Sequence, residues 1–237
     1  MTRKKYLLLT AGGSGTRMGG PVPKQFMEIG GRAVLHITMD RFVQAVPDIN
    51  VITVLPDTYI PYWRNYCASH SLPVRQTLVK GGISRFHSVR NALSSVPDGA
   101  LVAVHDGDRP LVSQEFIRKM FCQAEDVPAL VPVLPSVDTI RALSRTVQED
   151  GTVSFRQIDG VAADRSILFR VQTPQVFHSE ALKAAYAMPY DVSFTDDASV
   201  AERYGIPLSF TDGEQLNIKI TTPSDMVFAE AVLSLLR

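Results

Sequence analysis

A glycine-rich segment with two flanking cations is the clearest candidate for chemistry in this chain. Residues 11–19 read Ala-Gly-Gly-Ser-Gly-Thr-Arg-Met-Gly, and Pro-Lys-Gln follows at 23–25. Glycines allow a tight turn that presents bare N–H groups to an anion, and Arg17 and Lys24 would add positive charge. The segment lacks the Gly-Lys-Ser/Thr of a Walker A loop, and Met18 stands where the dinucleotide-binding pattern needs its third glycine. It therefore indicates a phosphate-binding loop of another kind, with a plain tight turn as the alternative.

A second glycine pair precedes a helical segment. Gly81-Gly82 is followed by Ser84, Arg85 and Ser88, whose side chains supply hydrogen-bond donors where the helix begins. The positive end of the helix dipole favours anions at that position. The segment is therefore a second candidate for phosphate binding, and the alternative is that Ser84 only caps the helix.

A carboxylate and a lysine belong to later apolar segments. His105-Asp106 ends one apolar run, and neighbouring strand residues point to opposite faces, so we interpret His105 as a buried histidine rather than a catalytic partner of Asp106. Asp106 is placed to hold Mg²⁺, which commonly takes one or two carboxylates plus substrate phosphates. Lys219 lies within 217–220, which we predict to be a strand, and an edge-strand lysine that prevents aggregation is the alternative. Residues 195–199, Thr-Asp-Asp-Ala-Ser, are also typical of a capped helix start.

The elements that must position these residues alternate between short apolar runs and amphipathic segments. Strands are predicted at 6–10, 51–55, 74–79, 101–105, 129–134, 208–210 and 217–220, and helices at 33–45, 58–69, 84–95, 113–125, 179–188, 198–204 and from 222 onward. Near-continuous apolar strands separated by helices predict an α/β, Rossmann-like fold, with a mostly parallel sheet and helices on both faces. Ligands of such sheets bind at the carboxyl ends of the strands, where the glycine-rich segment lies.

The alternation breaks between about residues 136 and 171. Asp150-Gly151 separates 146–147 from 152–153, and this pattern predicts a β-hairpin. A two-stranded hairpin is marginally stable alone in water. We therefore expect a projecting arm that packs on a second subunit. The sequence contains no linker or internal repeat, so residues 1–237 are predicted to form a single domain that carries this arm.

Charge and composition restrict the possible partners. The 237 residues include 24 Lys and Arg against 24 Asp and Glu, so the net charge is zero. General nucleic-acid or acidic-membrane binders usually carry a basic excess, so we expect neither partner. Apolar runs fall short of the ~18 residues of a membrane span, and 6–9 is too short for a signal-peptide core. Cys67 and Cys122 are predicted to be reduced thiols in the core, and the expected location is cytoplasmic.

Taken together, these segments resemble the 2-C-methyl-D-erythritol 4-phosphate cytidylyltransferases of the non-mevalonate isoprenoid pathway. The resemblance covers nearly the whole chain in order. It comprises 11–18, 23–25, Gly81-Gly82 with Arg85 and Ser88-Val89, His105-Asp106 with Arg109-Pro110, Asp138-Thr139, Asp164-Arg165, 172–175, Thr195-Asp196 with Ala198-Ser199, and 217–221. The ribitol-5-phosphate cytidylyltransferases of wall-polymer synthesis are the alternative. The forms at 195–199 and 217–221 look more like the isoprenoid enzyme.

The resemblance implies transfer of CMP from CTP to 2-C-methyl-D-erythritol 4-phosphate, with Mg²⁺ as cofactor and a homodimer as the assembly. A phosphate oxygen of the sugar-alcohol phosphate would attack the α-phosphorus of CTP, and pyrophosphate would leave. The implied catalytic residues are Arg17, Lys24, Arg165 and Lys219. The implied nucleotide-binding residues are Ala11, Gly12, Gly13, Gly15, Gly82, Arg85, Ser88 and Asp106, the last also as metal ligand. The implied sugar-phosphate site comprises Asp106, Arg109, Thr139, Arg165, Thr173, Thr195 and Lys219, with Thr139 and Arg165 reaching the active site of the second subunit.

The chain departs from the family pattern at four places. Gly12 stands where the family usually has alanine, and Ile83 where it often has an acid. Gly107-Asp108 replaces a pair of alanines, and Asp197 replaces a glutamate. Asp108 adds a negative charge beside the proposed phosphate site.

Overall fold

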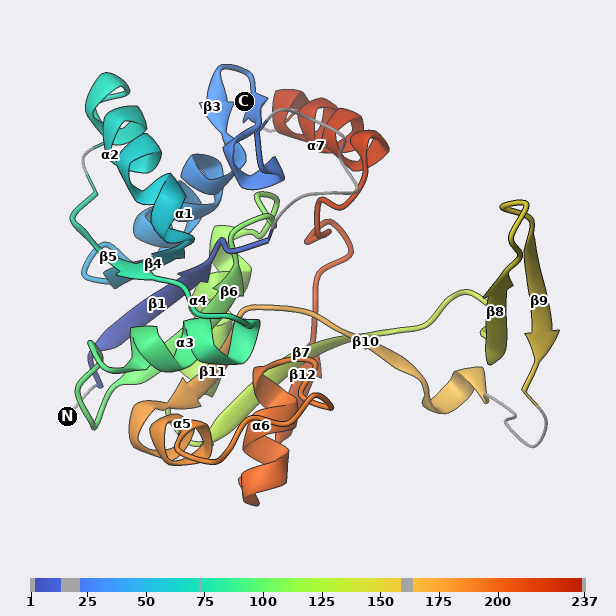
Figure 1. Cartoon of the computed structure of the whole chain (residues 1–237). Coiled ribbons are helices and arrows are strands. Elements are labelled where there is room, and N and C mark those ends of the chain that lie inside the picture. Colours follow the sequence, from blue (N-terminus) through green and yellow to red (C-terminus); the bar gives the residue numbers. More distant parts are fainter. Residues whose placement is uncertain (1–2, 14–21, 73, 159–163, 236–237) are drawn as a thin grey trace.

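A computed structural model describes residues 3–13, 22–72, 74–158 and 164–235 of the chain (Figure 1). Within these residues the central sheet has eight strands, in the order β10-β7-β11-β6-β1-β4-β5, with β12 also paired to β7. The strands are β1 (Lys5–Thr10), β4 (Asn50–Leu55), β5 (Gln76–Lys80), β6 (Leu101–Asp106), β7 (Ala129–Pro135), β10 (Phe169–Val171), β11 (Gln175–His178) and β12 (Ser209–Asp212). A short hairpin of β2 (Glu28–Ile29) and β3 (Arg32–Ala33) lies outside this sheet.

The strand pairing is mostly parallel, as the sequence predicts. β1 pairs in parallel with β4 and β6, β4 with β5, and β12 with β7. The sequence did not predict β10 and β11, which pair antiparallel with their neighbours. Thr10, the last residue of β1, lies opposite Asp106, the last residue of β6. This register brings the carboxyl ends of the central strands level at one edge of the sheet.

Helices cover both faces of the sheet, and this prediction is confirmed (Figure 1). The helices are α1 (Val34–Ala45), α2 (Ile60–Ser69), α3 (Arg85–Leu93), α4 (Gln114–Gln123), α5 (Ser179–Tyr186), α6 (Asp197–Tyr204) and α7 (Pro223–Leu235), with short 3-10 turns at η2 (Lys24–Phe26), η3 (Asp57–Tyr59) and η4 (Arg165–Ile167). Alternate strand residues face opposite layers. Leu7 packs with α1, α2 and α4, whereas Leu8 packs with α3, α5 and α6. A fully buried leucine stabilises a fold by about 1.5–3 kcal/mol relative to exposure.

Residues 217–220 do not form a strand, so that prediction is wrong. Their backbone groups bond elsewhere. Ile220 N donates to Asp108 O over 2.9 Å, and Ile220 O accepts from Lys24 Nζ over 2.7 Å. The carbonyl of Asn217 accepts from an arginine side chain over 2.9 Å. Because these partners satisfy the backbone, the segment is held as a loop without a strand beside it.

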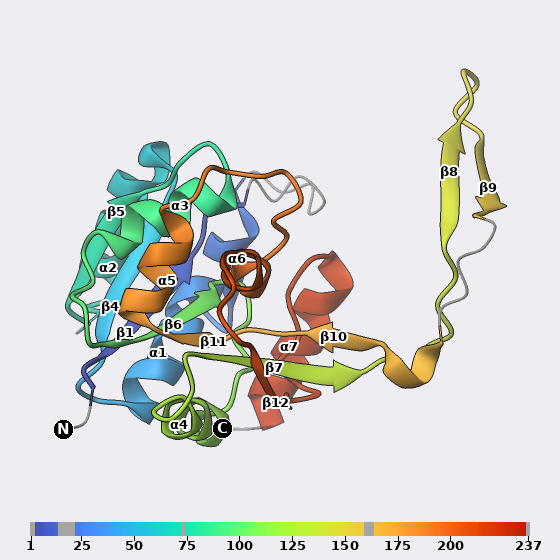
Figure 2. The same ribbon diagram turned by 90° about the horizontal axis from the view of Figure 1, so that it is seen from below.

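The hairpin predicted at Asp150-Gly151 is present as β8 (Leu143–Val147) and β9 (Val153–Gln157), which pair antiparallel. Gly151 has a φ of 83°, which favours glycine in a tight hairpin turn. All ten strand residues are exposed. Both views show the hairpin standing away from the body on the extensions of β7 and β10 (Figures 1 and 2).

Two further sequence expectations concern the body. Cys67 and Cys122 are free thiols, as predicted, but the prediction that both lie in the core is wrong for Cys122, which is exposed on α4. None of the helices in the described part of the chain combines the length and hydrophobicity that a membrane span requires.

Candidate active site

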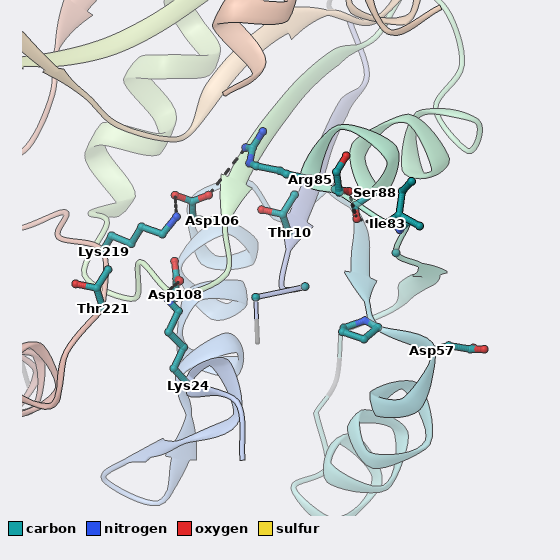
Figure 3. A pocket seen from close by; sticks show the side chains of 16 residues that line it. Thr10, Lys24, Asp57, Ile83, Arg85, Ser88, Asp106, Asp108, Lys219 and Thr221 are labelled. Atoms are coloured by element: carbon teal, nitrogen blue, oxygen red, sulfur yellow. Dashed lines mark hydrogen bonds and ion pairs between the residues drawn. The ribbon is translucent and has the colours of Figure 1, made fainter. Parts of the chain in front are cut away.

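A cavity of about 720 Å³ opens at the carboxyl edge of the central strands. Its volume lies within the ~300–1,000 Å³ usual for small-molecule sites. Its lining comes from β1, η2, β6, the start of α3, the turn after β4 and the 217–221 loop (Figure 3). The lining residues are Thr10, Gly12, Gly13, Lys24, Pro56, Asp57, Gly81, Gly82, Ile83, Ser84, Arg85, Ser88, Asp106, Asp108, Lys219 and Thr221.

The start of α3 forms one wall of this cavity. Ser84 caps the helix by accepting a hydrogen bond from His87 N over 3.4 Å. Ser88 Oγ accepts from Gly82 N over 3.0 Å and donates to Ser84 O over 2.9 Å. A Cβ at Gly82 would lie 2.3 Å from His87 Cβ, so only glycine fits at this approach. The wall therefore combines a cap with a bare glycine backbone at the positive end of a helix.

Asp106 is surrounded by cations. Lys219 Nζ and Arg109 Nε each lie 3.1 Å from Asp106 Oδ2, and Arg85 Nη2 lies 3.9 Å from Oδ1. Burial alone would raise the pKa of Asp106, but Lys219, Arg85 and Arg109 hold it well below its usual range. Its backbone N–H donates to Thr173 Oγ1 over 3.1 Å. Asp106 is therefore a fixed anion that gathers these cations at the strand end.

Arg85 is oriented by a buried carboxylate on α6. Its two terminal nitrogens donate to the two oxygens of Asp197 over 2.8 and 2.6 Å, and Tyr186 Oη donates to the same carboxylate over 2.6 Å. Burial works against the charge on Arg85, but Asp197 and Asp106 raise its pKa above the usual value. Burial and Asp197 also raise the pKa of Tyr186. Asp197 therefore fixes the guanidinium at the cavity wall.

Lys24 lies buried on the floor of the cavity. Its ammonium donates to Ile220 O over 2.7 Å and lies 2.6 Å from Asp108 Oδ2. Asp108 is itself only 8% exposed. Burial and the nearby charge of Asp106 raise the pKa of Asp108. The floor thus holds a buried ion pair between a residue of η2 and a residue of the turn after β6.

His105 faces the opposite side of β6 from this cluster. It is fully buried, its ring lies 4.8 Å from that of Phe42, and Nδ1 lies 3.1 Å from Thr173 Oγ1. Burial lowers the pKa of His105 to about 3. The histidine is therefore neutral at physiological pH, as its interpretation as a buried residue requires.

Most of the candidate residues from the sequence converge on the cavity. Gly12, Gly13, Lys24, Gly82, Arg85, Ser88, Asp106 and Lys219 line it. Ala11 is buried, Arg109 donates to the Asp106 carboxylate, and the Asp106 N–H donates to Thr173 Oγ1. Gly15 and Arg17 lie outside the described residues.

Three candidates lie away from the cavity lining. Thr195 is exposed before α6, and its N–H donates to Ser199 Oγ. Thr139 and Arg165 are exposed at the base of the arm, where Arg165 donates to Val137 O over 3.2 Å. If these two arm residues act in catalysis, they would act at a cavity other than the one in their own chain.

Several lining residues were not singled out from the sequence. They are Thr10, Pro56 and Asp57, whereas Gly81, Ile83, Ser84 and Thr221 lie within segments that the sequence did single out. Thr10 and Asp57 could have been found, because each ends or follows a parallel strand that points at this edge. Asp108 was noted only as an added charge, and its pairing with Lys24 has no local sequence signal because 84 residues separate the two.

The donor set at the cavity is suited to polyanions. Lys24, Lys219, Arg85 and Arg109 carry positive charge, and the bare glycine backbone lies at the positive end of α3. Preorganised cations of this kind stabilise charge that develops on a transferring phosphoryl group. The arrangement therefore fits binding and transfer of a nucleoside triphosphate.

Comparison with known families agrees with this chemistry. The sequence profile described as 2-C-methyl-D-erythritol 4-phosphate cytidylyltransferase matches residues 6–235. A protein of that name from Porphyromonas gingivalis is 44% identical over 99% of this chain and 100% of its own length. Another from Bacteroides fragilis is 42% identical over 95% of this chain and 98% of its own.

Solved structures give the same picture of the fold. The 4-diphosphocytidyl-2C-methyl-D-erythritol synthase of Anaerococcus prevotii has a TM-score of 0.76 and 28% identity, and the match covers 99% of this chain and 100% of that one. The 2-C-methyl-D-erythritol 4-phosphate cytidylyltransferase of Thermus thermophilus has a TM-score of 0.71 and 30% identity over 98% and 99% of the two chains.

Proposed function

This chain belongs to the 2-C-methyl-D-erythritol 4-phosphate cytidylyltransferase family, and on that premise we propose that it transfers CMP from CTP to 2-C-methyl-D-erythritol 4-phosphate and releases pyrophosphate. The chain is thus a nucleotidyltransferase. The observation that supports this best is the cavity whose glycine wall faces a cluster of ion-paired cations, of which Lys24 is buried. Nothing in the family match favours the ribitol-5-phosphate alternative.

Bringing two anions together is the main physical difficulty of this reaction. Two unit charges ~4 Å apart repel by about 4 kcal/mol at an effective dielectric of ~20. We assign Lys24 to the triphosphate and to the charge that develops at the α-phosphorus, together with Arg17. We assign Lys219 and Arg165 to the attacking phosphate, with Arg109, Thr139, Thr173 and Thr195 around the sugar alcohol. No covalent intermediate is needed, because the phosphate oxygen is already a nucleophile at neutral pH.

The nucleotide itself is assigned to the glycine walls. The backbone of residues 11–13, 15 and 82 would approach the phosphates and the base closely, since bare glycines leave it accessible. Ser88 and Arg85 would complete this wall. The bidentate pair with Asp197 supports that assignment, because it holds Arg85 in one orientation.

We propose Mg²⁺ as the cofactor and Asp106 as its protein ligand. Within the described residues, His, Cys, Asp and Glu side chains form no group of three or more that could hold a metal alone. Mg²⁺ commonly needs only one or two carboxylates when substrate phosphates supply the other oxygens. Asp106 lines the cavity, and its carboxylate is a hard oxygen donor of the kind that Mg²⁺ takes. Mg²⁺, when bound there, would neutralise phosphate charge.

We also propose that the enzyme is a homodimer joined through the arms. Val147, Val153 and Phe155 on β8 and β9 are exposed apolar residues, and two strands alone are marginal in water. In a two-fold dimer each contact is made twice, so Thr139 and Arg165 of each subunit would complete the site of the other. The cytoplasmic location and the absence of nucleic-acid or membrane partners stay predictions.

Pyrophosphate release tests the proposed function. The four nucleoside triphosphates are crossed with 2-C-methyl-D-erythritol 4-phosphate and ribitol 5-phosphate, in the presence of Mg²⁺ and after its removal with a chelator. We expect release only with CTP, methylerythritol phosphate and Mg²⁺. Faster release with ribitol 5-phosphate, or with another triphosphate, would assign the enzyme to a different substrate.

A further inference from the structure

Asp108 closes a small network that ties three parts of the cavity together. Its carboxylate Oδ2 lies 2.6 Å from Lys24 Nζ, and its backbone carbonyl accepts from Ile220 N over 2.9 Å. Lys24 Nζ in turn donates to Ile220 O over 2.7 Å. The turn after β6, the 3-10 turn η2 and the 217–221 loop are therefore joined at one point beneath the cavity (Figure 3).

The network gives Lys24 an anionic partner before any substrate arrives. The side chains of Lys24 and Asp108 are only 9% and 11% exposed, so water screens their attraction weakly. The charged groups that face Asp108 are Lys24 on η2, Asp106 on β6 and Lys219 on the loop. Phosphates that approach Lys24 must therefore share its ammonium with a carboxylate, or displace that carboxylate.

We propose that Asp108 is the positioning residue of Lys24, and that its carboxylate competes with the nucleotide phosphates for that ammonium. This inference rests on the proposed function. Two anchors, Asp108 Oδ2 and Ile220 O, fix the ammonium on the cavity floor. The same carboxylate places a negative charge beside the phosphate site and weakens nucleotide binding. Asp108 therefore favours the chemical step at the expense of affinity for CTP.

This arrangement predicts a distinctive pair of changes in Asp108→Asn. The amide keeps the shape of the side chain and removes its charge. We expect the Kd for CTP with Mg²⁺ to fall about tenfold, because Lys24 loses its competing anion. We expect kcat to fall about three- to tenfold, because the ammonium loses one of its two anchors. A merely structural role would weaken binding and turnover together.

The experiment measures the Kd for CTP by calorimetry without the sugar phosphate, and kcat with both substrates at saturating Mg²⁺. Asp98→Asn is the matched control, because Asp98 is exposed and its ion pair with Lys183, 2.8 Å long, lies outside the cavity lining. It removes the same charge and is expected to change neither constant. Asp108→Ala repeats the measurement should the asparagine variant be poorly folded, and a thermal melt of each variant shows whether the fold is kept.

A double mutant tests whether Asp108 acts through Lys24. In the Lys24→Met background, Asp108→Asn is expected to leave kcat unchanged, because the group that it positions is gone. An equal further loss of kcat in that background would overturn the proposal. A weaker Kd for CTP in Asp108→Asn, or a large rise in the Mg²⁺ concentration that gives half-maximal rate, would also overturn it and assign the carboxylate to the metal. If wild type binds CTP but fails to transfer CMP, the proposed function fails while the binding comparison still stands.

Discussion

Lys24 and Arg109 at the carboxyl edge of the sheet are buried or nearly so and ion-paired to carboxylates, whereas Arg165 at the base of the arm is exposed and donates to the carbonyl of Val137. The carboxyl edge of the sheet is held together by contacts between residues about 80 to 200 positions apart in the sequence. Lys24, for example, pairs with Asp108 and donates to Ile220 O. The arm is held by the pairing of β8 with β9 and by the extensions of β7 and β10.

This difference shows which side chains are held in position by contacts within a single chain. A buried charge must be paired, and the pairing fixes its position before substrate binds. Arg165 is exposed in η4, and its side chain has one carbonyl partner and no carboxylate partner among the described residues, so it is held less firmly than a buried ion pair. In the proposed dimer, the nucleotide half of the site would therefore belong to the body, and the arm residues would act only with a second copy of the chain.

Loss of the Lys24 ammonium should have the largest effect on turnover. We expect Lys24→Ala to lower kcat by about 10²–10³, similar to the loss of one preorganised donor. Lys183→Ala is the control, since it removes a surface lysine paired with Asp98. Circular dichroism should show the same fold for both variants. Near wild-type turnover in Lys24→Ala would remove this residue from the mechanism.

A substitution on the arm should abolish dimerisation and leave nucleotide binding unchanged. Phe155 is 64% exposed on β9, and Phe155→Asp places a charge on the apolar surface that we assign to the dimer. We expect sedimentation to shift to the monomer and turnover to fall at least about tenfold, while the Kd for CTP stays within about twofold, because the cavity lies in the body. A dimer that persists with full activity would place the interface elsewhere.

Lys219 should affect the second substrate more than the first. Its ammonium lies 3.1 Å from Asp106 Oδ2, and its side chain is 41% exposed. We expect Lys219→Ala to raise the KM for the sugar phosphate about tenfold and to leave CTP binding within a few-fold. The measurement is steady-state kinetics together with calorimetry of CTP. A selective loss of CTP affinity would instead assign Lys219 to the nucleotide.

The body should also lose stability in mild acid, and this is the smallest effect. Burial lowers the pKa of His105 to about 3, so the folded protein stays unprotonated while the unfolded chain gains a proton below about pH 6.5. The unfolded state binds more protons in this window, so the contribution of His105 to stability falls as pH falls from ~6.5 toward 3. Urea unfolding at pH 7 and pH 5 checks this, and His105→Asn should show a smaller difference. An equal difference in both proteins would contradict the assignment.

The sequence predicts the sheet and its helices well because their signals are local. Leu7, Leu8 and Leu9 form a continuous apolar run that marks a strand buried on both faces, and Ser84 and Ser113 mark helix starts that the structure confirms. The short strands β10 and β11 carry no comparable run and were missed. Residues 217–220 look like a strand, but tertiary hydrogen bonds to Asp108 and Lys24 hold them as a loop.

Some residues of the candidate site also have local sequence signals, and others do not. Glycines 12, 13 and 82 and Asp106 could be placed from the sequence, because each follows or ends a parallel strand or precedes a helix. The partners that fix the charged groups could not. Asp197 for Arg85 and Asp108 for Lys24 are brought together only by the folded chain, across 112 and 84 residues.

Subunit mixing tests the shared site most directly. Lys24→Ala and Arg165→Ala subunits, each nearly inactive alone, are mixed, dissociated and reassociated, and exchange is confirmed by mass spectrometry. Random pairing makes half of the dimers mixed. Each mixed dimer would carry one site with both substitutions and one site with neither. About a quarter of all sites would then be intact, so activity should recover to roughly a quarter of wild type. If Arg165 serves its own subunit, every site keeps a lesion, and the absence of recovery with confirmed exchange would contradict the shared site.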